Sequence, residues 1–266
     1  IGEAAELLDE ETIAALPQAA MLDMQLDHQL GRFEDAEAKL DRYLERFPDY
    51  GPLNAAASVL AMDVDRPDLA RSAAEKGGAH PDAMATLGVL DLGERKFEEA
   101  RAQLARSLAT RPHNPRAEIG LGLVELGEGN LADACARLDR GAEQFGSHLG
   151  SWIAAGWAHF LAGDYAAARQ RFETALAHDD SFGEAQGSLA AVEMMEGDIG
   201  GAKRRAAVAR RLDPNAFSGA LAAMLIEQAQ GNTKTARRIF ELAAKQPILP
   251  NGATLMDELV RTLGKA

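Results

Sequence analysis

The feature that most constrains this chain is one fixed spacing between small residues, which recurs along its second half. Five alanines keep this spacing, and four glycines keep it at a second phase: Ala100, Ala134, Ala168, Ala202 and Ala236, and Gly129, Gly163, Gly197 and Gly231. The step from Ala100 to Ala134 is 34 residues (134 − 100), and we call it the repeat period. A period of this size indicates a stack of identical supersecondary units, each packed only on its neighbours. Such a stack presents a long surface to other molecules, so the period favours a binding function over catalysis.

The composition favours helices over strands, because alanine is abundant while the β-branched residues Val, Ile and Thr are sparse. Cys135 is the only cysteine, which excludes an intrachain disulfide and a cysteine-rich zinc site. No stretch approaches ~20 uninterrupted apolar residues, so no membrane-spanning helix is expected. The sequence therefore predicts an all-α protein that does not itself cross a membrane.

The formal net charge of −13 is spread unevenly. Residues 1–80 carry 17 acidic and 7 basic side chains, whereas residues 199–266 carry 5 acidic and 11 basic ones. The acidic total argues against nucleic acid as a general partner. The opposite signs at the two ends are compatible with end-to-end association of copies of the chain, and a solvated helical surface is the alternative interpretation.

The chain begins at Ile1 rather than Met, which indicates a mature or trimmed segment. A targeting segment upstream would not be visible in it. A cytoplasmic or a periplasmic bacterial protein is expected, and the sequence leaves that choice open.

The units can be laid out in register as 81–114, 115–148, 149–182, 183–216 and 217–250. The unit 149–182 carries a set of aromatic and small residues at fixed places, namely Trp152, Gly156, Gly163, Tyr165, Ala168, Phe172 and Ala175. This set resembles the tetratricopeptide repeat, and the resemblance extends over about nine-tenths of the chain. It implies two antiparallel helices per unit, stacked into a right-handed superhelical solenoid of about seven repeats.

The register also continues upstream and leaves a segment at each end. A unit at 17–50 is followed by an irregular one at 51–80, which is four residues short. We interpret the deficit as a clipped second helix that bends the array or forms a hinge, or alternatively as a tolerated deletion. The remaining segments predict an N-terminal helix within 1–16 and a capping helix within 251–266.

In the tetratricopeptide repeat family the first helix of each unit faces an inner groove. The resemblance assigns apolar side chains to that groove, together with Leu161: Ile119, Leu123, Leu126, Ile153, Trp157, Phe160, Met194, Met195, Leu221 and Leu225. An apolar groove of this kind suits an apolar peptide or an amphipathic helix, because flexible methionines repack around varied side chains. The alternative is that some of these side chains are buried within the array itself.

No residue pattern supports catalysis. The six histidines show no metal-ligand spacing, and His159 stands where the family carries a packing tyrosine. Cys135 has no histidine at motif spacing and is interpreted as a packing residue. We therefore expect no enzymatic activity, no cofactor and no metal site.

These observations predict a non-catalytic adaptor or chaperone that binds a protein or peptide partner in its concave groove. One alternative is a self-associating assembly scaffold that acts through its charged ends and outer face. Another is that the chain is the repeat arm of a larger enzyme or of a secretion or envelope-assembly protein.

Overall fold

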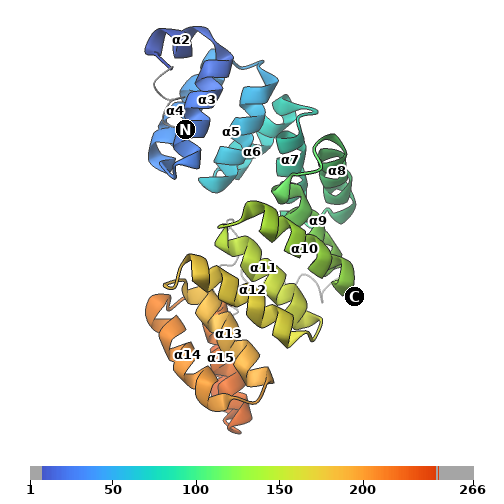
Figure 1. Cartoon of the computed structure of the whole chain (residues 1–266), viewed down its shortest axis with the longest axis vertical. Helices are drawn as coiled ribbons and strands as arrows, with labels where there is room; N and C mark the ends of the chain where they lie inside the picture. Colours follow the sequence, from blue (N-terminus) through green and yellow to red (C-terminus); the bar gives the residue numbers. More distant parts are fainter. Residues whose placement is uncertain (1–7, 244, 246–266) are drawn as a thin grey trace. The chain divides into compact units, whose positions relative to one another are not determined.

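The computed structural model describes residues 8–243 and residue 245 (Figure 1). Every regular element in this part of the chain is an α-helix, and the helices follow one another as antiparallel pairs. The all-α repeat array expected from the period is thereby confirmed. None of the described helices combines the length and the apolar character needed to cross a membrane.

The chain divides into two compact units, residues 1–128 and 129–266, and each is described by itself. The first unit contains α2 (Glu10–Ala15), α3 (Pro17–Gln29), α4 (Phe33–Arg46), α5 (Gly51–Asp63), α6 (Pro67–Gly77), α7 (Pro81–Gly93), α8 (Phe97–Thr110) and α9 (Pro115–Gly127). The second unit contains α10 (Leu131–Phe145), α11 (Leu149–Leu161), α12 (Tyr165–His178), α13 (Gly183–Met195), α14 (Ile199–Leu212), α15 (Phe217–Ala229) and α16 (Thr233–Ala243).

The structure describes only part of the two segments predicted at the ends of the chain. Of the helix expected within 1–16, the structure describes Glu10–Ala15 as α2. The capping helix expected within 251–266 lies outside the described residues.

The turn between the two helices of a repeat is built from a glycine followed by a capping aspartate. Gly163 and Gly197 adopt φ values of 80° and 87°, which a residue with a Cβ rarely adopts. Asp164 then accepts a hydrogen bond from the Ala167 N–H at 3.0 Å, which caps the start of α12. Asp198 caps α14 in the same way. The periodic glycines thus end the first helix of each repeat in these pairs, as predicted.

The helices of a pair approach each other most closely at the mid-helix glycines. A Cβ placed on Gly88 would lie 2.5 Å from Cγ of Leu104, and one on Gly156 would lie 2.3 Å from Cε1 of Phe172. Both distances are far below van der Waals contact. These positions therefore require the absence of a side chain, as the repeat pattern predicted.

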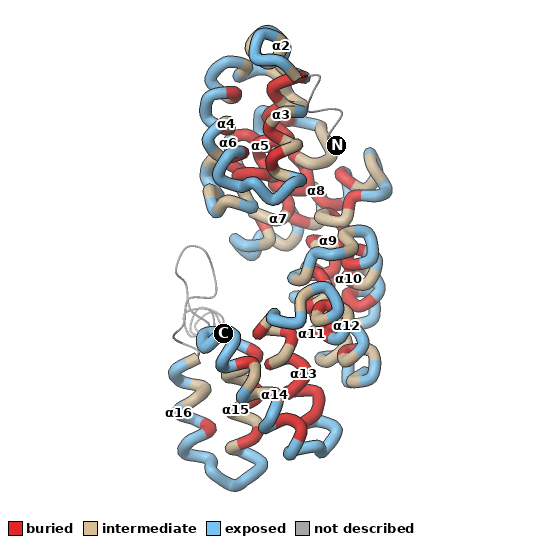
Figure 2. Tube along the Cα trace, turned by 60° about the vertical axis from the view of Figure 1, so that its left-hand side comes forward, coloured by how far each residue is buried: buried red, intermediate tan, exposed pale blue. Residues whose placement is uncertain are grey.

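The buried residues form a row of small cores between neighbouring helices of each unit (Figure 2). In the first unit one core surrounds Leu40 and Leu60, and another surrounds Leu104 and Leu121. In the second unit a core forms around Phe172 and neighbouring residues of α11 and α13. Each core joins only adjacent helix pairs, which is the packing expected of a repeat array.

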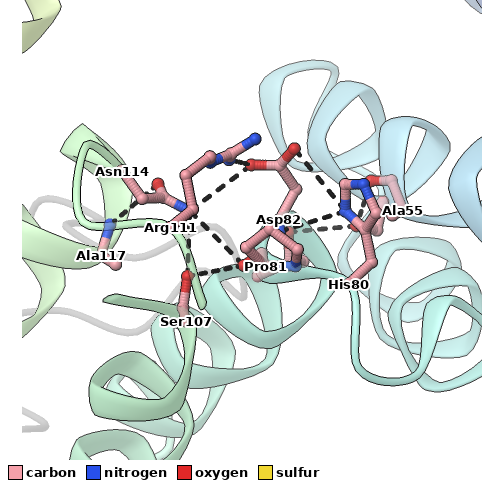
Figure 3. A network of polar contacts seen from close by, with 10 residues as sticks. Ala55, His80, Pro81, Asp82, Ser107, Arg111, Asn114 and Ala117 are labelled. Atoms are coloured by element: carbon pink, nitrogen blue, oxygen red, sulfur yellow. Dashed lines mark hydrogen bonds and ion pairs between the residues drawn. The ribbon is translucent and has the colours of Figure 1, made fainter. Parts of the chain in front are cut away.

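A polar network fastens the end of α8 to the start of α7 (Figure 3). The Ser107 hydroxyl donates to the Pro81 carbonyl at 2.7 Å, and the Asn114 amide donates to the Ser107 hydroxyl at 2.9 Å. Arg111 pairs with Asp82 at the edge of the same network. Since Asn114 is also the N-cap of α9, the network fixes where the next repeat begins.

The irregular unit at 51–80 has a shortened second helix. Helix α6 spans 11 residues, whereas its counterpart α8 spans 14. It ends at Gly77 and is followed by the C-cap residue Gly78, whose φ is 59°. The clipped helix predicted from the sequence is therefore present, while the boundary between the two compact units lies further along the chain, between Glu128 and Gly129.

Candidate functional site

The candidate site is a row of apolar side chains on α11, α13 and α15, the first helices of three repeats in the second unit. We call it the first-helix face and define it by Trp157, Phe160, Leu161, Met194, Met195, Leu221 and Leu225. Leu161 and Met195 are exposed, and the other five are half-buried. The face therefore belongs partly to the packing of the unit and partly to its surface.

The aromatic pair Trp157 and Phe160 forms the most tightly packed part of this face. The centroid of the Trp157 ring lies 5.1 Å from that of Phe160 and 5.5 Å from that of Phe172, both in edge-to-face geometry. Phe160 also contacts Tyr165 edge-to-face at 5.3 Å. Because Phe172 is fully buried on α12, Trp157 is held by the core and presents only part of its surface.

The exposed part of the face consists of Leu161 and Met195, which stand at the same place in successive repeats, and Ile199, outside the face, is a further exposed aliphatic side chain. Leu161 ends α11 and is 58% exposed, and Met195 ends α13 and is 46% exposed. Ile199 begins α14, next along the chain, and is 38% exposed. The sequence analysis did not single out Ile199, although it stands one repeat period after Tyr165 and follows a capping aspartate.

Four further residues were predicted to line the groove, one in the second unit and three in the first. Ile153 is buried in the core around Phe172, so it contributes to packing. Ile119, Leu123 and Leu126 lie on α9 in the first unit, where all three are half-buried.

Recurring ion pairs join the second helix of one repeat to the first helix of the next. Arg101 on α8 pairs with Glu125 at 2.5 Å and with Glu128 at 2.6 Å. Arg71 on α6 makes the equivalent pairs with Asp91 and Glu94. These acids were overlooked in the sequence, although an acidic residue recurs in register with the repeat period, at Asp91, Glu125, Glu193 and Glu227.

His159 stands at the place that is acidic in these other repeats, and a different arrangement joins the helices there. The ring of His159 on α11 lies 3.0 Å from Asp139 of α10, which also accepts hydrogen bonds from Arg171 of α12 at 2.9 and 2.7 Å. Burial raises the pKa of Asp139, but the hydrogen bonds from Arg171 and His159 outweigh burial and hold the pKa below its ordinary value. His159 thus has a structural partner.

The remaining residues considered for catalysis or metal binding lie in surroundings typical of packing and turns. Within the described residues, no three His, Cys, Asp or Glu side chains gather in a way that could hold a metal ion. Cys135 is buried, and burial raises the pKa of its thiol, which disfavours the reactive thiolate. Asp179 accepts hydrogen bonds from the backbone and hydroxyl of Ser181, which is the geometry of a turn.

Comparison of the sequence with protein-family models identifies a tetratricopeptide repeat over residues 85–147. This range contains α8, α9 and α10 completely, so it reaches into the second unit. No curated protein sequence matches the chain.

Several solved structures share the fold. A chain of the APC/C hetero-tetramer Cut9–Hcn1 matches with a TM-score of 0.71 and 16% identity over 86% of this chain and 46% of that one. PilF of Pseudomonas aeruginosa matches with a TM-score of 0.58 and 19% identity over 76% and 94% of the two chains. PilW, a type IV pilus biogenesis factor, matches with a TM-score of 0.60 and 14% identity over 77% and 96%.

The chain spans less than half the length of the Cut9–Hcn1 chain that it matches. At these identities the likeness concerns the fold and not the activity. The matched model identifies a tetratricopeptide repeat within residues 85–147, and the recurring helix pairs and the shared folds show that the described residues form a tetratricopeptide-like array.

Proposed function

We propose that the second unit is a non-catalytic binding module that holds an apolar or amphipathic peptide segment of a partner protein on the first-helix face. Tetratricopeptide repeats mediate protein–protein interactions, so a protein partner follows from the family. The choice of this face and of an apolar segment is our inference.

The observation that carries the proposal is the exposure of Leu161 and Met195 at the same place in successive repeats, with Leu161 directly following the packed aromatic pair Trp157 and Phe160 on α11. Large apolar side chains that are exposed to water gain hydrophobic free energy when a partner covers them. Methionine adapts to side chains of different shape, whereas Trp157 and Phe160 are already fixed by packing. Because the aromatic side chains are already held in place, less conformational entropy is lost when a peptide binds.

The names of the structural neighbours are consistent with a role in assembly. PilW is described as a type IV pilus biogenesis factor, and Cut9–Hcn1 as a hetero-tetramer. For this chain they support an adaptor that helps to assemble a larger protein complex. They do not indicate which complex.

The proposal can be tested with a phage-displayed library of random 16-residue peptides selected on the full chain. Enriched peptides are expected to carry apolar residues at helical spacing. Their affinity, measured by fluorescence polarisation, should fall at least tenfold when Leu161 and Met195 are both replaced by serine. Both side chains are exposed, so the double variant should keep its fold.

The matched control is Leu22→Ser, which removes a similarly exposed leucine (48%) from α3 in the first unit. It should bind the selected peptides as tightly as the unmodified chain. Equal affinity of the chain and its Leu161→Ser, Met195→Ser variant would exclude this face as the binding site.

A further inference from the structure

One junction between repeats lacks the large side chains that fill two of the others. In the second unit Phe172 and Leu189 are buried together, and Leu176 packs against them. In the first unit the equivalent residues Leu104, Leu108 and Leu121 also pack together. One repeat period after Phe172, Leu176 and Leu189, the sequence instead carries smaller or charged residues. These are Ala206, Arg210 and Ala223.

At this junction a cleft of about 390 Å³ lies between α14 and α15, and Ile239 of α16 also lines it. Ala206, Arg210 and Ala223 all line it. The rest of its lining is mainly small or apolar and includes Ala207, Ala220 and Ile226. A protein interior is normally packed without such voids, so the open cleft distinguishes this junction from the two filled ones.

Helix α14, which forms one wall of the cleft, is strongly cationic, and two of its basic side chains, Lys203 and Arg210, line the cleft itself. This helix carries five basic side chains and no acidic one. Arg205 pairs with Glu193 at 2.8 Å. The other four have no carboxylate partner among the residues that the structure describes, and all four are exposed: Lys203, Arg204, Arg210 and Arg211.

Two carboxylates also line the cleft, and each already accepts a hydrogen bond. Asp213 accepts from the backbone N–H of Asn215 at 2.9 Å, and Glu227 accepts from the Asn232 amide at 2.8 Å. Neither carboxylate forms an ion pair with Lys203 or Arg210 among the described residues, so these two cations, which also line the cleft, remain available to an external anion.

We propose that the cleft between α14 and α15 is a second binding site, which takes an apolar side chain from an acidic segment of a partner protein. The apolar group would fill the space that Leu or Phe fills at the other junctions. The acidic residues would pair with the free cations of α14, which are spread from Lys203 to Arg211 over about 12 Å. That span exceeds the size of one carboxylate, so it matches a segment with several acidic residues better than a small anion.

This site is independent of the first-helix face. Its residues on α15 are Gly219, Ala220, Ala223, Ile226 and Glu227, whereas the face uses Leu221 and Leu225. Failure of one proposal therefore leaves the other unaffected, because separate variants test them.

The decisive variant restores the leucines of the filled junction, as Ala206→Leu with Ala223→Leu. Since Leu104 and Leu121 coexist at the equivalent places, the change should fill the cleft and raise the melting temperature. The peptide library is then selected on the full chain in the presence of excess soluble double variant, so that only peptides that need the open cleft are retained. Where the double variant does not fold, Ala206→Leu alone serves as the competitor.

The retained peptides are expected to combine at least two Asp or Glu residues with a Leu, Phe or Trp. They should bind Arg210→Glu at least tenfold more weakly than the unmodified chain, and their affinity should decrease with added salt. The matched control Arg106→Glu, on the exposed surface of α8, should bind them normally.

The proposal is overturned if no peptide survives this competition, or if the survivors lack acidic residues or bind Arg210→Glu unchanged. It is also overturned if light scattering shows that the chain is an oligomer that Ala206→Leu with Ala223→Leu converts to a monomer. The occupant of the cleft would then be a second copy of the chain.

Discussion

The contact between Gly156 and Phe172 shows how single residues set the geometry of a repeat. Phe172 is fully buried and lies under both Gly156 and Trp157. A methyl group on the glycine would collide with the ring, whereas the tryptophan packs against its edge. One side chain on the second helix therefore determines both the distance between the helices and the position of the largest residue of the first-helix face.

We predict that Gly156→Ala destabilises the second unit by roughly 1–3 kcal/mol, because the added Cβ forces the Phe172 ring to move. Gly93→Ala is the matched control, since a Cβ at this last residue of α7 meets no atom within 4 Å. It should be neutral or stabilising by up to about 1 kcal/mol. Urea denaturation of both variants measures the difference, and equal effects would contradict the steric explanation.

At the scale of helices, ion pairs determine how one repeat is joined to the next. Arg169 on α12 pairs with Glu196 after α13, and this hydrogen bond raises the pKa of the arginine. Arg101 makes the corresponding contacts in the first unit. Between α10 and α11, Cys135 stands at the place equivalent to Arg101 and Arg169. Asp139 of α10 joins these two helices instead, through its contact with His159 of α11. Helices with different sequences are thus joined at equivalent places by different chemistry.

We predict that Asp139→Asn destabilises the fold by roughly 1–2 kcal/mol at neutral pH, because the charged hydrogen bonds to Arg171 and His159 are weakened. The folded-state pKa of Asp139 lies below the unfolded value of about 3.9. Its contribution is therefore complete above pH 4 and is lost as the pH falls through the folded-state pKa.

Unfolding free energies measured between pH 7 and pH 2 should show the variant and the unmodified chain converging at the acid end. Asp180→Asn, at an exposed position before α13, is the control and should change stability by no more than about 0.5 kcal/mol. A difference that stays constant over the whole pH range would rule out the charge of Asp139 as the cause.

At the scale of the whole molecule, stability is distributed over local cores, because each repeat packs mainly on its neighbours. The cores around Leu40, Leu104 and Phe172 are separate clusters. The chain correspondingly divides into two compact units. A repeat array of this kind can lose structure in one region while another region stays folded.

We predict that Gly156→Ala accelerates amide hydrogen exchange in α11–α13 at least tenfold, while exchange in α3–α6 stays within twofold of the unmodified chain. Hydrogen-exchange mass spectrometry under native conditions gives both values from one sample. A uniform acceleration over both units would show instead that the chain unfolds as a single cooperative body.

The sequence predicted the helix pairs because their requirements are local and repeat at a fixed step. A glycine with positive φ, an aspartate cap and a small residue at the helix crossing each depend on a few nearby atoms, and Gly163, Asp164 and Gly156 confirm them. The empty junction was also readable in principle, since Ala206 breaks a series of large side chains. The ion pairs were not predicted, because their partners lie on different helices and meet only when those helices are packed.

What the sequence determined by itself is the repeat, its register and the apolar character of the first helices, since these follow from spacing alone. Only the tertiary structure decided how much of each apolar side chain reaches the surface. Ile153 is buried while Leu161, two turns later on the same helix, is exposed, because exposure depends on what neighbouring helices cover. The cleft beside Arg210 likewise exists only because three small or charged residues from two helices meet at one place.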